Sequence, residues 1–592
     1  MLYFVYTAKT RVYLLISRAH FCIEMKKGFL TAAVLLNAII VVAQPDKPKG
    51  FENSSHDVIS GTNIKLIPAS KLSIEPVVPK TETPKITLKY ETPEFNWNTP
   101  KLIQTIDPDK IKEKGIDSIA LSNYVRLGGG NNTHILGEVY LSNKPNSKWS
   151  YHLNLAQLQA KNKTTLQEFA NTRIQLGGAR FFNNSSLNAS LFYNRDHVAF
   201  FAKDSSFQSE GKSTAIDLFN SGKTANTYGV NIDYVSLATN KKPEIKWLNR
   251  LSSFNSNTNH DELEVNSALK MLKTHKNLTM WGELAFTDIQ SKQKRDTAKS
   301  QSTINQVFVD FKPRVQFIHK QTDLNVQVGL NVTYNKNTTS SSSKNYINPF
   351  IYLEKGITGL EMKVFGSIDG GLMKNSLRRM NEVMPYFADT LQLKNQYEQL
   401  NGYIGIKGKI SGNSQFSLDF GGNSVSDMLV FVSAKESNKS TYDSLNLMRA
   451  TYLNNVSSFY FRAFAQYNLG ESLKILGNLK VIQYSQTVYH LPSFTFNLSA
   501  EYSPISTVLI KLGMQGVGTR YNSLMTDAIT NKFTTVALKN YTDIYARIDY
   551  RFNGAGRIWI QGSNLLNQNY QTYYGYKAFG LTVMGGISIA LF

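Results

Sequence analysis

Two glycine-rich stretches of the chain have spacings that could bind phosphate groups. Gly211–Thr214 reads GKST, like the end of a nucleotide-binding loop, but such a loop needs a glycine five residues earlier, where this chain has Ser206. The stretch at 126–132, RLGGGNN, lacks the strand-to-helix context of a dinucleotide site. We therefore interpret the first stretch as a polar external loop and the second as a hairpin turn.

The histidines and the cysteine do not form a recognisable reactive centre. The nine histidines are scattered, with no His-x-x-x-His or Glu-x-x-His spacing, which gives a metal site no support. His152 shares the polar face of a predicted strand with Ser150 and Asn154, and lining of a polar lumen is a better interpretation of this set than catalysis. The only cysteine is Cys22, which precedes the expected mature chain. The sequence therefore predicts no catalytic, cofactor-binding or metal-binding residue.

The N-terminus carries the pattern of an export signal. Met25 is followed by two lysines and then by an apolar run that ends at Ala43. A basic start, an apolar run and a small residue before the cleavage point are typical of secretory signal peptides. We predict that 1–24 is a non-native extension, that 25–43 is the signal peptide, and that the mature chain begins near Gln44.

The segment 44–117 differs in composition from the rest of the chain. It contains nine of the 16 prolines and shows no sustained period of 2 or 3.6 residues. Proline removes backbone donors and favours extended, unpaired chain. The segment is therefore predicted to be an extended, proline-rich periplasmic stretch.

The remaining part, 118–592, alternates apolar and polar residues in one segment after another. Apolar side chains occupy every second position of 324–334, 494–502 and 544–552, and most positions between them are polar. A period of two places the two sets on opposite faces of a β-strand. A soluble β-sandwich and a transmembrane barrel both show this alternation.

Strand length and aromatic placement decide between the two architectures. Many of the predicted strands have ten residues or more, whereas strands of soluble proteins usually have about five or six. Aromatic residues gather near strand ends, as they do in the interfacial girdles of outer-membrane barrels; the examples are Trp149, Tyr151, Tyr573, Tyr574 and Tyr576. We predict an all-β fold, a transmembrane antiparallel β-barrel with a polar lumen.

The connections between the predicted strands give the strand number. Ten of them are short and rich in Gly, Asn and Pro, which suit tight turns; they lie near 143, 183, 240, 275, 320, 354, 411, 469, 503 and 553. The connections between these are often longer, at 202–225, 288–302, 372–395, 425–452, 517–537 and 564–577. Short turns on one side and longer loops on the other are typical of such barrels. Ten short turns predict about 22 strands if both chain ends lie on the short-turn side.

The last predicted loop carries a recognisable motif. GSNLLNQNYQ resembles the Asn-Leu-Phe-Asp/Asn-x-x-Tyr motif that precedes the last strand of TonB-dependent receptors. The matching positions are Asn564, Leu565, Leu566, Asn567 and Tyr570, with Leu566 in place of the usual Phe. The resemblance covers roughly 119–592 and implies a receptor-like barrel whose last external loop contains this stretch.

Two further features bear on the resemblance. The chain ends in an alternating stretch that stops at Phe592, and this resembles the C-terminal signal that the outer-membrane assembly machinery recognises. Receptors of this family carry a folded plug before the barrel, usually with a TonB-contacting box. The segment 44–117 shows neither pattern, so the chain resembles a plugless member of the family. Such a lumen must be filled by 44–117, by infolded loops such as 372–395, or by a partner.

The expected function follows from the fold and the charge. The leading hypothesis is ligand uptake or binding at the outer membrane of a Gram-negative bacterium, without enzyme activity and with an unknown ligand. The alternative is a structural or scaffold barrel of an envelope complex, and a barrel enzyme is a distant third. The net charge of +22 fits anionic lipid and lipopolysaccharide better than nucleic acid, which an exported chain rarely meets. The basic spots 292–296 and Arg378–Arg379 are expected in external loops, where they are either solvated or contact lipopolysaccharide phosphates. A periplasmic partner is expected to bind through 44–117.

Overall fold

The computed structural model describes residues 123–591, except 144–147, 163–165, 202–221, 239–241, 295–300, 338–341, 388–392, 411–413, 434–446, 471, 528–531 and 553–554. All the described residues belong to the second of two compact units, Trp97–Phe592. The predicted signal peptide, the segment 44–117, the GKST stretch and Phe592 lie outside the described residues.

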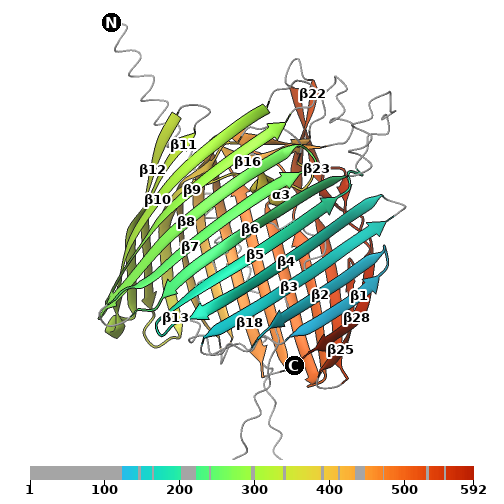
Figure 1. The fold of residues 1–592 in the computed structure, drawn as a ribbon, viewed down its shortest axis with the longest axis horizontal. Helices are drawn as coiled ribbons and strands as arrows, with labels where there is room; N and C mark the ends of the chain where they lie inside the picture. The colour runs from blue at the N-terminus through green and yellow to red at the C-terminus, as the bar shows by residue number, and fades with distance from the viewer. Residues whose placement is uncertain are drawn as a thin grey trace, which may run out of the picture. The chain divides into compact units, whose positions relative to one another are not determined.

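The alternating segments form a single sheet of 22 strands, as the sequence predicts (Figure 1). Their bounds in chain order are β1 (Tyr124–Gly130), β2 (His134–Ser142), β3 (Trp149–Asn162), β4 (Gln167–Phe181), β5 (Ser185–Val198), β6 (Lys223–Ser236), β7 (Glu244–Ser256), β8 (His260–His275), β9 (Leu278–Lys294), β10 (Gln301–His319), β11 (Leu324–Asn337), β12 (Ser342–Gly356), β13 (Met362–Met373), β14 (Gln396–Lys409), β15 (Gln415–Ser426), β18 (Val456–Leu469), β19 (Leu473–Tyr484), β20 (Phe494–Ile505), β21 (Val508–Val517), β24 (Tyr541–Arg551), β25 (Gly556–Ser563) and β28 (Thr582–Ala590). Each strand pairs antiparallel with the next in this series. The last, β28, pairs with β1, so the sheet is a closed barrel without free edges.

Glycines allow the first and last strands to approach closely. Gly128 of β1 lies opposite Gly586 of β28. A Cβ added at Gly586 would lie 2.0 Å from the carbonyl oxygen of Leu127, and one added at Gly128 would lie 2.4 Å from the Trp559 ring. The ring of Trp559 therefore covers the seam from the inside because neither glycine carries a side chain.

The two faces of the strands differ as the alternation predicts. On β11, Val328 points out of the barrel and is 45% exposed, whereas Thr333 and Asn335 on the opposite face are buried. Many exposed large apolar side chains of the described residues follow the same outward positions, among them Leu498 and Ile548. An outward apolar band around a polar interior is the surface that a bilayer requires.

The ten predicted short connections each follow an even-numbered strand of the 22 in the series, so all lie at one end of the barrel. One of them contains a 3-10 turn, η1 (Lys320–Thr322). The prediction of a loop at 288–302 is wrong in extent, because β9 continues to Lys294 and β10 begins at Gln301. Antiparallel pairing continues along these polar residues because it satisfies their backbone groups.

The opposite end carries connections with structure of their own. Between β13 and β14 lies the helix α3 (Leu377–Val383); no helix of the described residues is long and apolar enough to cross a membrane. Three pairs of short strands lie in the connections β15–β18, β21–β24 and β25–β28; they are β16 (Met428–Ser433) with β17 (Met448–Leu453), β22 (Arg520–Asp527) with β23 (Lys532–Leu538), and β26 (Gln571–Tyr573) with β27 (Tyr576–Lys577).

Candidate functional site

The long connections pack together into what we call the loop cap, which comprises the described residues of 374–395, 427–455, 485–493, 518–540 and 564–581. Its apolar core is buried and joins residues from several connections to the inner faces of β6, β7 and β10. The core consists of Ala225, Phe254, Ile304, Leu377, Met380, Met384, Phe387, Leu393, Phe431, Met448, Ala450, Tyr573 and Tyr576. Loops that share a buried core with the wall can close this end of the barrel.

Helix α3 begins at a carboxylate of the barrel wall. Ser376 caps the helix by accepting a bond from the backbone N–H of Arg379. Glu262 of β8 accepts bonds from the backbone N–H groups of Leu377 (2.6 Å) and Arg378 (3.3 Å). A carboxylate is stabilised at a helix N-terminus, where N–H groups have no intrahelical partner. Glu262 therefore docks α3 onto β8.

Arg378 adds an ion pair to the same contact. Its guanidinium lies 2.7 Å from Glu264 of β8 and 3.0 Å from Glu382 on the next turn of α3. Arg378 and Arg379 lie in a connection between two barrel strands, at the end with the long connections. Arg378 is nevertheless turned onto the wall, where two carboxylates neutralise it, so its charge is directed at the barrel rather than at lipopolysaccharide.

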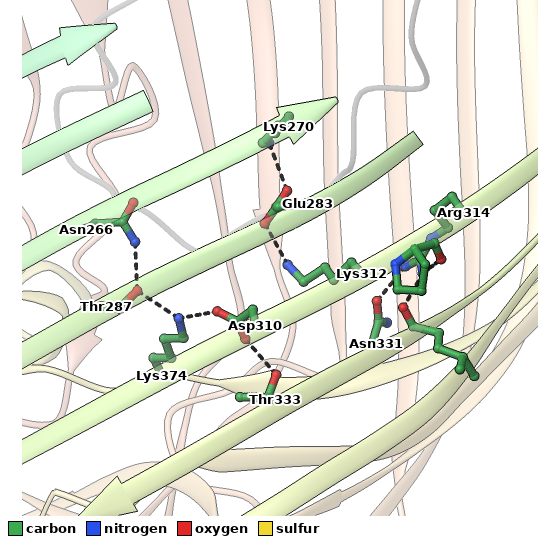
Figure 2. Close-up of polar contacts among 12 residues, drawn as sticks. Asn266, Lys270, Glu283, Thr287, Asp310, Lys312, Arg314, Asn331, Thr333 and Lys374 are labelled. Atoms are coloured by element: carbon green, nitrogen blue, oxygen red, sulfur yellow. Dashed lines mark hydrogen bonds and ion pairs between the residues drawn. The ribbon is translucent and has the colours of Figure 1, made fainter. Parts of the chain in front are cut away.

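Lys374 ties the start of this connection to the wall, as Figure 2 shows. Its Nζ lies 2.6 Å from Asp310 of β10 and 2.9 Å from the hydroxyl of Thr287 on β9. Thr333 of β11 donates a bond of 2.6 Å to the other oxygen of Asp310. Lys374 is therefore the point at which one connection is bonded across three strands of the wall.

The wall carries a second polar network that does not involve the cap (Figure 2). Glu283 lies 3.0 Å from Lys270 and 3.2 Å from Lys312. Arg314 donates bonds to the carbonyl of Leu330 and to the amide oxygen of Asn331. These contacts join neighbouring strands, and the opposite charges of Glu283 and its two lysines stabilise the sheet.

The end of the 374–387 stretch is also bonded to the wall. Lys223, the first residue of β6, donates a bond of 2.9 Å to the carbonyl oxygen of Phe387. The Phe387 ring lies 5.8 Å from the ring of His260 on β8 and stacks on it. Both ends of the stretch are thus held on the inner face of β6–β10.

The last connection, 564–581, completes the cap. The rings of Tyr386 and Tyr576 stack with centroids 3.5 Å apart, and the Tyr573 hydroxyl donates a 2.8 Å bond to the carbonyl of Val383. Burial raises the pKa of Tyr573 and Tyr576 well above its usual value, so both stay protonated. The prediction that these tyrosines form an interfacial girdle is wrong: Tyr576 is only 1% exposed, and its ring packs on the other connection instead of lipid.

The predicted motif residues build the turn from which this connection starts. Asn564 and Asn567 both have φ of 48°, a left-handed conformation that asparagine tolerates. The Asn564 side chain donates to the carbonyls of Gln568 and Phe579 and accepts from the backbone N–H of Gln568. Tyr570 stacks on Tyr541 of the wall with centroids 3.8 Å apart.

The two leucines of the motif behave differently from its amides. Leu565 and Leu566 are both partly exposed, at 39% and 52%. The motif thus positions the last connection through its amides and Tyr570 rather than through its leucines.

A histidine is buried where two further connections meet. His490 lies between β19 and β20, and its Nε2 is 2.9 Å from the amide oxygen of Asn522 on β22. Asn522 in turn bonds Ser433 of β16 through both its side-chain groups. Burial is the main cause that lowers the pKa of His490 to about 4; the Asn522 bond opposes the shift and the nearby Arg520 guanidinium adds to it. His490 is therefore neutral at pH 7.

The cap contains no recognisable reaction centre. Among the described residues, no group of three or more His, Cys, Asp or Glu side chains could hold a metal ion. His152 lies on the inner face of β3 with Ser150 and Asn154, and its ring covers Gly177. Sequence reasoning missed Glu262 and Lys374, whose only signals are their places on an inward strand position and in a long connection.

Comparison with known proteins supports the fold. No protein-family model and no curated protein matches the chain. The siderophore receptor PirA from Acinetobacter baumannii matches with a TM-score of 0.60, 11% identity, and coverage of 79% of this chain and 80% of that one. The FrpB iron transporter from Neisseria meningitidis matches with a TM-score of 0.61, 11% identity, and coverage of 79% and 81%. The copper transporter OprC matches with a TM-score of 0.59, 8% identity, and coverage of 79% and 81%. The resemblance to the barrels of TonB-dependent receptors is thus confirmed at the level of the fold.

Proposed function

We propose that this chain is an outer-membrane barrel for uptake or binding of a ligand, and that the loop cap is the gate at its external end. One observation carries the proposal. The wall is a closed barrel of 22 strands, and its long connections are docked on its inner face by polar bonds. Proteins with a similar barrel include receptors and transporters for siderophores, iron and copper.

The kind of contact in the cap supports a gate. Lys374 and Arg378 of the cap form ion pairs with the wall, and Glu262 of the wall accepts a hydrogen bond from the first residue of α3. Water can replace such contacts when the cap swings away, and opening needs no change in the barrel itself. Movement of packed loops around a fixed scaffold is a common form of gating.

Several elements of the proposal concern residues outside the described part. We propose that 25–43 directs export, that the mature chain begins near Gln44, and that 44–117 forms no plug. Instead, 44–117 lies at the periplasmic mouth or binds a periplasmic partner. Phe592 serves as the signal for the outer-membrane assembly machinery, and the outward apolar band contacts lipid and lipopolysaccharide.

The structure also gives one argument for the alternative, a scaffold barrel of an envelope complex. The apolar core of the cap buries aromatic rings from two connections, and such a core resists opening. A gate must open a path through the lumen, whereas a scaffold barrel needs no such path and could keep this core closed.

Conductance in planar bilayers separates the two functions. The purified mature chain is compared with a variant lacking 44–110 and with a cap variant carrying Lys374→Met. If the chain is a gated barrel, the cap variant should open far more often than the wild type. If neither the wild type nor any variant conducts although all assemble, uptake through this barrel is excluded and the scaffold function stands. A further rise on deletion of 44–110 would assign that segment to the periplasmic mouth.

A further inference from the structure

One level of the lumen wall, about halfway along the strands, has more positive than negative charge. Asp419 of β15 lies opposite Arg462 of β18, and Arg462 lies opposite Lys480 of β19. On the far side, Lys480 faces Thr495 of β20. Directly opposite residues of an antiparallel pair share a face, and their Cβ atoms lie about 4.5–5.5 Å apart. Two cations therefore stand side by side with a single carboxylate next to one of them.

Arg462 is held in a fixed position. Its Nε donates a 2.7 Å bond to Asp419, and its guanidinium carbon lies 5.1 Å from the Tyr403 ring centroid and 4.9 Å from that of Tyr460. The Tyr460 hydroxyl is fixed in turn by a 2.8 Å bond to Asn401. Since Asp419 takes only Nε, the two Nη groups have no acceptor among the described residues. The Arg462 side chain lies on the lumen face and is 32% exposed, so the Nη groups are accessible from the lumen.

Lys480 has no carboxylate partner among the described residues. Its side chain is exposed on the lumen face, and Arg462 is the charged group that acts on it. Like charges directly opposite each other destabilise a sheet. An anion placed between the ammonium and the free Nη groups would remove this repulsion and form charge-assisted hydrogen bonds to both.

A neighbouring part of the wall shows how the barrel treats such a pair when it supplies the anion itself. Lys363 of β13 lies opposite Lys407 of β14. Glu354 of β12 bridges them, with one oxygen 3.1 Å from Lys363 and the other 2.9 Å from Lys407. No described carboxylate takes the corresponding place between Arg462 and Lys480.

We propose that Arg462 and Lys480 form a binding site for an oxyanion, a carboxylate or phosphate group of a solute in the lumen. Arg462 presents a planar pair of donors on a rigid support, and Lys480 supplies a mobile point charge opposite it. Asp419 orients Arg462 and at the same time limits how tightly the anion binds. The inference rests on the proposed function in that it names the charge of the ligand the barrel takes.

Titration of the detergent-solubilised full chain with inorganic phosphate, followed by calorimetry, tests the site. Wild type should bind phosphate, and Lys480→Gln should weaken binding about tenfold because one charge-assisted bond is lost. Lys480→Arg should restore most of the affinity. Asp419→Asn should tighten binding severalfold, because it removes the competing negative charge. A barrel damaged by the substitution would bind phosphate more weakly, so tighter binding by Asp419→Asn cannot come from damage to the fold.

The matched control is Lys511→Gln. Lys511 also faces the lumen, but Glu501 lies 2.7 Å from its Nζ and already neutralises it. This variant should bind phosphate like wild type. The proposal is overturned if wild type binds no phosphate, if Lys480→Gln binds as wild type does, or if Lys511→Gln loses as much affinity as Lys480→Gln. Binding in detergent does not depend on conductance, so a barrel that binds phosphate but never conducts would refute the uptake function and leave the site standing.

Discussion

Replacing Lys374 by methionine should release one anchor of the loop cap. The wild-type Nζ lies 2.6 Å from Asp310 and 2.9 Å from Thr287. Lys374→Met keeps the length of the side chain and removes its charge. Asp310, which is only 7% exposed, would then keep Thr333 as its remaining bonding partner among those described.

The size of the effect follows from burial. Removing one member of a buried ion pair costs about 3–5 kcal/mol, because the other charge is left without compensation. Lys374 itself keeps 22% exposure, so we take the lower end, about 3 kcal/mol. If this contact is broken when the cap opens, the opening equilibrium should rise roughly 150-fold. The double variant Lys374→Met with Asp310→Asn should recover part of the loss, since no buried charge remains.

Two assays measure opening independently. Planar-bilayer recordings should show more frequent openings for Lys374→Met. Trypsin should cleave after Arg378 or Arg379 faster than in wild type, because both residues are protected only while α3 is docked. Lys312→Met is the matched control: it removes another lumen lysine, but its partner Glu283 keeps Lys270, so the cap should be unaffected.

A gating role of Lys374 is refuted if Lys374→Met matches wild type in both conductance and cleavage while the barrel assembles normally. It is also refuted if Lys312→Met opens the barrel as much, since the effect would then come from loss of lumen charge in general.

Three further predictions concern the wall and the cap. Val328→Arg should destabilise the assembled barrel by about 2–4 kcal/mol, the cost of a charge on the lipid face, whereas Gln327→Arg should be tolerated. Heat-modifiable migration on gels reports assembly of both variants. Equal tolerance would mean that the two faces are misassigned. Gly586→Ala should lower the free energy of unfolding in urea by about 1–3 kcal/mol, because it overpacks the seam. Gly585→Ala should be nearly neutral, because its Cβ would lie no closer than 3.4 Å to its neighbours. Similar losses for both would contradict the close approach of β1 and β28. The folded pKa of His490 lies below the ordinary value of 6.5, so its contribution to folding stability is complete above pH 6.5. This contribution should fall by roughly 3 kcal/mol as the pH drops toward 4. Hydrogen exchange of 485–493 should rise over this window in wild type but not in His490→Gln.

The barrel could be predicted from the sequence because its information is local. Alternation over 324–334 assigns Val328 to one face and Gln327 to the other without any knowledge of neighbouring strands. Hairpin connections between consecutive strands then give the order of the sheet, and counting the short turns gives 22 strands. The loop expected at 288–302 is too long, because polar residues can continue the hydrogen-bonded pairing of two strands as readily as they can form a loop.

The cap could not be predicted because its contacts join residues that are far apart in the chain. Glu262 and the N–H of Leu377 are separated by 115 positions. On the sequence, Glu262 is one more polar residue on an inward face, and nothing distinguishes it from its neighbours. The prediction for Tyr573 and Tyr576 is wrong for a related reason. Aromatic residues at a strand end suit both a lipid girdle and a buried contact, and only the fold of the 374–387 stretch decides between them.

The positions of the cap and of the proposed anion site suggest an order of events. Val456, the first residue of β18, follows directly after the β16–β17 pair of the cap, and Arg462 lies six positions further toward the short-turn end. A solute that enters from the cap end therefore meets the cap contacts before it reaches Arg462 and Lys480. In that case the cap controls how fast an anion arrives, and the two cations control how long it stays. Loosening the cap should change the rate of phosphate binding and leave its affinity unaltered, whereas loss of Lys480 should do the reverse. A gate and a binding site that can be altered separately distinguish a passage for solutes from a barrel that only supports its partners.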